Sequence, residues 1–144
     1  MRKLVLSLLT ALISLTALAQ QGDGTFKGYL YNKEYQVFLK INFVDNNVVP
    51  DGQELFGELP GFFGAKRDPR QWLITKASVT GKKSAKLDII NDYGSEDLTA
   101  TLSYDGNGTY TLKQESGSRI KIAVNRKWVK IPTSLKFTRA DEKD

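Results

Sequence analysis

The sequence of 144 residues contains neither cysteine nor histidine. Without cysteine there are no disulfide bonds, no thiolate nucleophile and no cysteine-ligated zinc. Without histidine there is no imidazole proton relay and no Ser-His-Asp or Cys-His catalytic machinery. The reactive groups that remain are carboxylates, lysines, tyrosines and hydroxyls. We therefore expect no cofactor and no metal site, and we expect the protein not to be an enzyme.

Long hydrophobic runs are also missing, apart from one at the N-terminus. Arg2 and Lys3 precede a mainly apolar run from Leu4 to Ala19, which closes with Ala17-Leu18-Ala19. A positive start, an apolar core and small residues before the cleavage point are typical of a secretory signal peptide. The run is shorter than the roughly 20 residues of a membrane-spanning helix. We expect residues 1–19 to be a cleaved signal peptide, residues 20–144 to form one domain, and no stable membrane span to remain.

The chain carries only a slight excess of positive charge. The chain has 21 basic and 16 acidic residues. Removal of residues 1–19 takes away Arg2 and Lys3, so 19 − 16 gives a net charge of +3. Nucleic-acid binders usually carry a dense basic stripe, and this chain is not predicted to be one. An exported domain of this size without disulfides is also more typical of a bacterium than of a eukaryote. We therefore expect a bacterial periplasmic or secreted protein.

What the sequence does contain is alternation of apolar and polar residues. Leu39, Ile41 and Phe43 fall on one face of an extended segment, while Lys40 and Asn42 fall on the other. Such alternation is typical of antiparallel strands with one buried face. Eight or nine strands are expected, at about residues 25–30, 35–43, 55–59, 71–79, 84–91, 98–104, 109–114, 119–124 and 135–139.

Turn signals separate these segments at short intervals. Asp105-Gly106-Asn107-Gly108 lies between two alternating segments, and its residues tolerate the positive φ of a tight hairpin. Consecutive hairpins predict an all-β, up-and-down meander. Because a meander of this size must protect its edge strands, we expect it to close into a small barrel of eight or nine strands. A β-sandwich of two sheets is the alternative.

The layout resembles the lipocalin and avidin class of barrels, the calycin type. The first strand opens with Gly24-Thr25-Phe26-x-Gly28, and the last strand reads Leu135-x-Phe137-x-Arg139. In lipocalin-like barrels a glycine near an aromatic residue in the first strand recurs with an arginine in the last. Ring and guanidinium stack across the closed end of such barrels, and Phe26 stands where those families usually have tryptophan. The resemblance implies an architecture and assigns no ligand residues.

The most irregular stretch runs over residues 44–70, which hold three of the four prolines. Within it, residues 59–64 place Phe62 and Phe63 beside flexible glycines. A long loop in a small domain often carries function. The two rings are candidates for a binding lip that meets a ligand or a partner. The alternative is that they plug one end of the barrel.

Four further residues are candidates for ligand contact. Arg67 and Arg70 belong to a basic turn that could hold an anionic group, although a solvated loop is the commoner explanation of such a turn. Trp72 and Trp128 could offer flat apolar surfaces to a ligand if they are exposed. A tryptophan near a strand end is more often part of the core. The exposure of these two rings therefore decides between the two interpretations.

Two functions follow from these candidates. The first is an exported, non-enzymatic binding domain that takes a small apolar or amphiphilic ligand at the mouth of the barrel. The second is a protein-interaction or inhibitor domain that binds an extracytoplasmic protein through residues 59–70 or through a basic face. A hydrolase built on two carboxylates is the remaining enzymatic route. Glu96 and Asp97 are adjacent, so their side chains diverge in an extended chain, and the sequence offers no pair at suitable spacing.

Overall fold

The computed structural model describes residues 24–142, so the expected signal peptide lies outside the described residues. This part of the chain consists of strands, turns and one short 3-10 helix, η1 (Glu54–Phe56). The strands are β1 (Lys27–Asn32), β2 (Val37–Asn42), β3 (Gly61–Ala65), β4 (Asp68–Val79), β5 (Ser84–Asn91), β6 (Asp97–Gly106), β7 (Thr109–Gly117), β8 (Lys121–Val124), β9 (Lys127–Lys130) and β10 (Ser134–Arg139).

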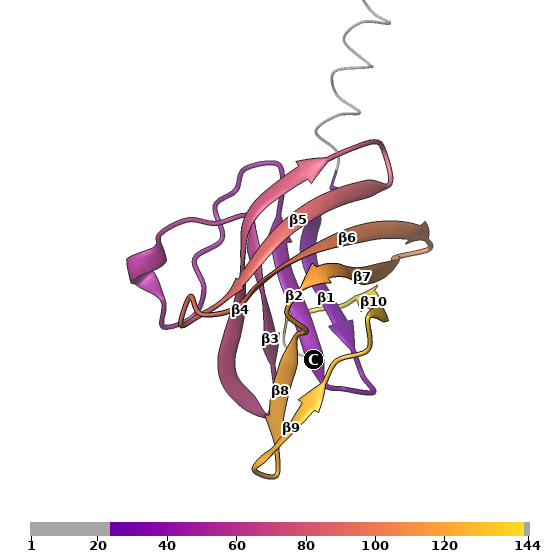
Figure 1. Ribbon diagram of the computed structural model, residues 1–144. Coiled ribbons are helices and arrows are strands. Elements are labelled where there is room, and N and C mark those ends of the chain that lie inside the picture. Colours follow the sequence, from indigo (N-terminus) through magenta and orange to yellow (C-terminus); the bar gives the residue numbers. More distant parts are fainter. Residues whose placement is uncertain (1–23, 143–144) are drawn as a thin grey trace, which may run out of the picture.

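Eight of these strands form a closed antiparallel barrel in the order β1-β10-β7-β6-β5-β4-β3-β2 (Figure 1). Neighbours in the sheet follow one another along the chain, except that β10 pairs with both β1 and β7. The segment between β7 and β10 forms a separate two-stranded hairpin, β8–β9. The prediction of an all-β meander that closes into a small barrel is confirmed. Closure leaves no unpaired edge among the barrel strands.

The alternating apolar residues point into the barrel and pack against one another. Leu39, Leu87, Leu102, Leu112 and Phe137 are at most 1% exposed. They belong to one hydrophobic cluster that extends over all eight barrel strands. Burial of these side chains is the main stabilising contribution to the fold. The interior is therefore built from packed side chains contributed by every strand.

Aromatic rings and an arginine cover the end of the barrel at which β1 begins. Phe26 stacks on Phe43 with ring centroids 5.6 Å apart, and Tyr110 meets Phe26 edge-on at 6.4 Å. The Arg139 guanidinium lies 5.8 Å from the Tyr110 ring centroid. It donates hydrogen bonds to the Lys27 carbonyl oxygen at 2.7 Å and to the Tyr110 hydroxyl at 2.6 Å. The guanidinium thus lies over Tyr110, and Phe26 pairs with another ring.

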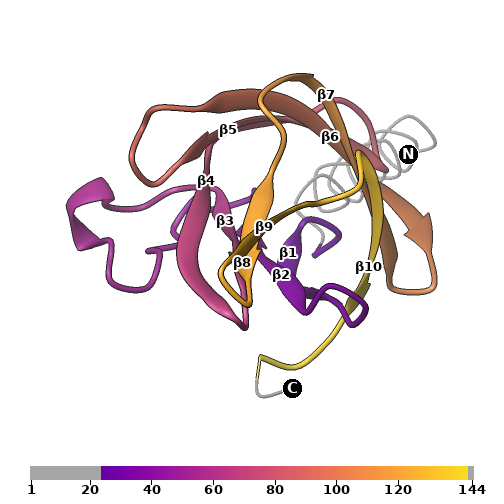
Figure 2. The same ribbon diagram turned by 60° about the horizontal axis from the view of Figure 1, so that its bottom comes forward.

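The β8–β9 hairpin covers the opposite end, as the view onto that end shows (Figure 2). Ile120, Ile122 and Ile131 from this segment are buried in the main cluster. The hairpin turns at Asn125 and Arg126, which have φ values of 54° and 66°. Two consecutive positive φ values are the geometry of a type I′ turn. β9 was not expected from the sequence.

The segment before β3 differs from the expectation. The strand predicted at residues 55–59 is wrong, because η1 occupies residues 54–56 and Leu59 makes only an isolated bridge to Val48. The irregular stretch predicted at residues 44–70 is also shorter than expected. Gly61–Ala65 forms β3, which pairs with β2 and β4, so the expected loop ends near Pro60. Pairing on both sides overrides the low strand propensity of the glycines.

Candidate functional site

A surface pocket of about 260 Å³ opens where the hairpin passes the start of β4 and the β5–β6 turn. Two exposed aromatic rings contribute to its wall, together with side chains of both charges. The lining residues are Arg70, Gln71, Trp72, Asn91, Asp92, Tyr93, Ser95, Glu96, Lys121 and Trp128. The pocket therefore combines apolar and polar surface at the hairpin-covered end of the barrel.

Asp68, at the start of β4, attaches the hairpin to the barrel. Its side chain is only 1% exposed. One carboxylate oxygen accepts a hydrogen bond from the backbone N–H of Ala123 at 2.8 Å. The other accepts from the backbone N–H of Arg70 at 3.2 Å and from its Nη1 at 3.1 Å. A single buried carboxylate therefore positions both β8, the strand of the hairpin next to the barrel, and the Arg70 wall of the pocket.

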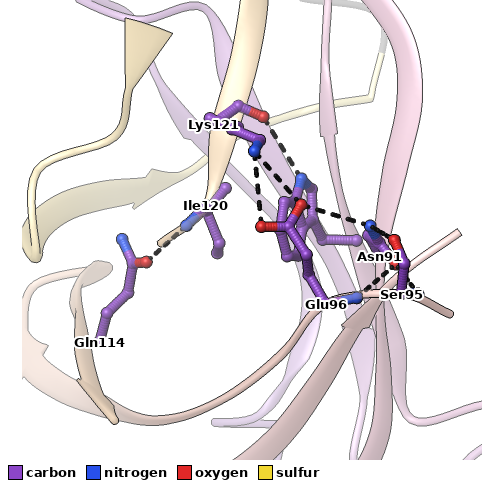
Figure 3. Close-up of polar contacts among 7 residues, drawn as sticks. Asn91, Ser95, Glu96, Gln114, Ile120 and Lys121 are labelled. Carbon is purple, nitrogen blue, oxygen red and sulfur yellow. Dashed lines mark hydrogen bonds and ion pairs between the residues drawn. The ribbon is translucent and has the colours of Figure 1, made fainter. Parts of the chain in front are cut away.

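A second polar network joins the hairpin to the β5–β6 turn (Figure 3). Lys121 Nζ lies 3.3 Å from a Glu96 carboxylate oxygen. Asn91 shapes the turn, because its Oδ1 accepts from the backbone N–H groups of Ser95 at 2.9 Å and Glu96 at 3.2 Å. The Trp72 indole N–H donates to the Lys121 carbonyl oxygen at 3.4 Å. These bonds hold β8 against the barrel wall.

The base of the hairpin is held by a buried amide. Gln114 Oε1 accepts from the Ile120 backbone N–H at 2.8 Å, which Figure 3 also draws. Gln114 Nε2 donates to the Pro132 carbonyl oxygen at 3.2 Å. One side chain therefore bonds to the chain entering β8 and to the chain leaving β9. This arrangement fixes where the hairpin stands relative to β7.

Trp128 forms the exposed wall of the pocket and is 57% exposed. The Arg70 guanidinium lies 4.9 Å from its ring centroid, and Lys121 Nζ lies 5.3 Å from it. Cations at such distances are attracted by the electron-rich ring face. Tyr93, in the β5–β6 turn, is 78% exposed. Two large rings thus remain open to solvent at one pocket.

Gln71, a lining residue of the pocket, has one buried amide oxygen without a partner. The residue is 7% exposed, and its Nε2 donates to the Asp51 carbonyl oxygen at 3.0 Å. That bond assigns Nε2 as the donor atom, so Oε1 can only accept. The buried Oε1 has no hydrogen-bond partner. A buried acceptor without a partner is unfavourable, so Gln71 Oε1 lowers the stability of this part of the fold.

The charges of the pocket largely neutralise one another. Arg70 is paired with Asp68 at 3.1 Å, and Lys121 is paired with Glu96 at 3.3 Å.

Within residues 24–142, no group of three or more acidic residues stands close enough to hold a metal ion. The same residues contain no helix with the length and apolarity of a membrane span.

Three of the six candidate ligand residues come together at this pocket. They are Arg70, Trp72 and Trp128, of which Trp72 is only 4% exposed. Arg67 is exposed on the β3–β4 turn, and its Nη2 donates to the Tyr35 carbonyl oxygen at 3.3 Å. It does not line the pocket.

Phe62 and Phe63 do not form a lip, because both lie in β3 and are buried. Phe62 is 0% exposed and packs with Val48 and Leu73 on the outside of the barrel. Phe63 is 1% exposed and points into the barrel, where it meets Phe137 edge-on at 6.5 Å. Adjacent residues of a strand face opposite sides. The two rings therefore serve two different clusters.

Sequence reasoning did not select Gln71, Tyr93, Glu96 or Lys121 as ligand contacts. Tyr93 and Glu96 lie in a polar turn of ordinary composition, and Lys121 alternates with core isoleucines. The sequence offered one signal for this site, which is the bulky ring of Tyr93 within a short polar turn.

A second surface hollow, of about 400 Å³, lies over β4–β7, and no aromatic ring lines it. No protein-family model, curated protein or solved structure matches this chain.

Proposed function

We propose that this chain is an exported, non-enzymatic binding domain that takes a small amphiphilic ligand at the hairpin-covered mouth of the barrel. One observation carries the proposal. The exposed Trp128 and Tyr93 rings flank a pocket whose wall also carries amide and charged side chains, among them Gln71 and Glu96. Ligand sites typically combine apolar walls with a few polar groups that orient the ligand.

The composition of the pocket favours a ligand with an apolar face and a polar edge. The apolar face would lie against Trp128, more than half of which is open to solvent. The polar edge of the ligand would meet the amide and charged side chains that line the pocket. The proposed site lies at the rim, since side chains from all eight barrel strands pack in the interior. The residues 1–19 pattern supports a location in the periplasm or outside a bacterial cell.

We also propose that the barrel is of the lipocalin-like type. The support is Arg139, which donates to carbonyl oxygens of the first segment, including those of Gly24 at 2.9 Å and Lys27 at 2.7 Å. The guanidinium also lies over a ring at the same end, although that ring belongs to Tyr110. The arginine of the last strand thus covers the end of the barrel at which the first strand begins.

The alternative, a protein-interaction or inhibitor domain, has less support from residues 59–70. β3 and β4 take up most of that segment, so only the turn between Ala65 and Asp68 could enter a cleft of a partner protein. A basic face remains available to a partner protein at the hairpin, where Arg126, Lys127 and Lys130 are exposed.

Intrinsic fluorescence tests the binding function directly, because Trp72 and Trp128 are the only two tryptophans of the chain. The probe is the amphiphile 1-anilinonaphthalene-8-sulfonate, titrated against the protein. We expect saturable binding that quenches tryptophan emission. Trp128→Ala should weaken the affinity by about tenfold, since loss of a stacked ring corresponds to roughly 1.4 kcal/mol.

The matched control is Phe56→Ala, which removes a ring that is 41% exposed on η1 and lies outside the pocket. This variant should bind the probe with unchanged affinity. Equal loss in both variants, or binding that never saturates, would refute a ligand site at the pocket. Native mass spectrometry of the exported protein then shows whether it retains a molecule from the cell.

A further inference from the structure

The C-terminal part of the chain carries positive charge without compensation. No acidic residue occurs between Glu115 and Asp141. The basic residues in this interval are Arg119, Lys121, Arg126, Lys127, Lys130, Lys136 and Arg139. The first five of them belong to the hairpin and its connections. The slight excess of positive charge in the whole chain is therefore concentrated in this interval.

The fold places these cations at one end of the molecule. The hairpin projects from the barrel at the bottom of Figure 1 and comes forward in Figure 2. Arg126, Lys127 and Lys130 are exposed, and Arg126 stands in the turn itself. The bond between Asp68 and Ala123 brings the β3–β4 turn beside the hairpin. Arg67 and Arg70 of that region are exposed too.

Most of these cations have no carboxylate partner. The ion pairs in the described part of the chain join Lys27 to Asp45, Lys40 to Glu142, Arg70 to Asp68 and Lys121 to Glu96. Arg67, Arg126, Lys127 and Lys130 take part in none of them. Their charge is available to an external anion.

An exposed aromatic residue lies among the cations. Trp128 follows Lys127 in β9, and Arg70 lies 4.9 Å from its ring centroid. Tryptophan and tyrosine concentrate at the boundary between lipid headgroups and water, because their rings are apolar with one polar edge. Basic side chains add attraction to anionic lipids. A projecting surface that carries both suits a flat anionic bilayer better than a narrow partner.

We propose that this surface, the hairpin end formed by Arg67, Arg70, Arg126, Lys127 and Lys130 around Trp128, docks on an anionic phospholipid bilayer. The contact is peripheral: cations lie at the headgroups and the Trp128 ring enters the interfacial layer. The proposal is independent of ligand binding in the pocket. If both hold, the pocket opens next to the bilayer, since Arg70 and Trp128 belong to both surfaces.

The test is sedimentation with vesicles of equal parts phosphatidylglycerol and phosphatidylcholine, compared with vesicles of phosphatidylcholine alone. The protein is used as a bacterial host exports and processes it. We expect binding to the anionic vesicles only, weakened by added salt. Each basic residue near such a surface contributes about 1 kcal/mol. The variant Arg126→Gln, Lys127→Gln, Lys130→Gln should therefore partition about one hundredfold less.

A matched control removes three exposed cations from the opposite end of the barrel. Lys82 and Lys83 lie in the β4–β5 turn, and Lys86 lies near the start of β5. Their replacement by glutamine changes the net charge by the same amount and should alter partitioning by less than about threefold. Equal loss in both triple variants would show that net charge alone acts, and it would overturn the proposal.

Two further measurements separate lipid from other anions. In the Trp72→Phe variant, Trp128 emission should shift to shorter wavelength with anionic vesicles and stay unchanged with neutral ones. Binding to soluble heparin without binding to vesicles would overturn the lipid assignment in favour of a polyanion. The hairpin substitutions lie outside the pocket lining, so probe binding at the pocket can persist when vesicle binding is lost.

Discussion

Replacement of Asp68 by alanine should loosen the hairpin and lower the stability of the domain. The carboxylate is buried and accepts hydrogen bonds from Ala123 N–H at 2.8 Å and from two donors of Arg70. A hydrogen bond to a charged group contributes about 1.5–3 kcal/mol. Arg70 is exposed, so its donors can return to water at little cost, whereas the Ala123 N–H is partly buried. We therefore expect Asp68→Ala to reduce the free energy of unfolding by about 2–3 kcal/mol.

The assay is urea unfolding followed by far-ultraviolet circular dichroism, which reports on the whole barrel. Asp68→Asn is the control, because its amide oxygen can still accept from Ala123 without the charge. It should cost about half as much as the alanine variant. Acrylamide should also quench Trp72 more strongly in Asp68→Ala as the hairpin moves away. A loss below about 0.5 kcal/mol, or equal losses in both variants, would refute the role assigned to this carboxylate.

Three other predictions concern a glycine, a tyrosine and the tryptophans. In a urea titration, Gly61→Ala should destabilise the domain by more than about 2 kcal/mol. The reason is that the added Cβ would lie 2.4 Å from the Lys40 carbonyl oxygen of β2. Gly81→Ala is the control, because its Cβ would meet open space and the variant should be near neutral. Burial raises the pKa of the Tyr29 hydroxyl above its usual 10.0. The unfolded chain then ionises first, so the free energy of unfolding should fall as pH rises above 10 and fall less in Tyr29→Phe. Each single-tryptophan variant reports on one ring. Acrylamide should quench the emission strongly in Trp72→Phe, where the remaining Trp128 is 57% exposed. It should quench weakly in Trp128→Phe, where the remaining Trp72 is 4% exposed.

Much of the barrel could be predicted because its strands alternate. In β5, Ala85, Leu87 and Ile89 point inward while Lys86 and Asp88 point outward, as the pattern indicates. The turn at residues 105–108 was also predictable, since Gly106, Asn107 and Gly108 all adopt the positive φ that their residue types tolerate. Both signals are local, and no distant contact opposes them.

The errors arose where tertiary contacts override local preference. The glycines and prolines around Phe62 indicated a loop, yet Gly61 lies against the backbone of β2, where no larger residue fits. That close approach makes β3 a strand and buries both phenylalanines. β9 was missed because Trp128 and Lys130 face solvent and give no clear alternation.

The candidate site depended almost entirely on the tertiary structure. Trp72 and Trp128 were selected one at a time, on ring chemistry alone. Their proximity results from the return of the chain after β7, which lays β8 beside β4 and sets Lys121 next to Glu96. No spacing rule connects residues so far apart in the sequence.

The sequence by itself determined the alternating strands, the tight turns and a chemistry without cysteine or histidine, because these depend on residue types and near neighbours. Only the tertiary structure decided where the hairpin lies, which aromatic rings are buried, and which side chains share a pocket. Barrel closure brings distant segments together, and the buried groups Asp68, Asn91 and Gln114 then select one position for the hairpin. Those contacts exist only after folding, so no local pattern records them.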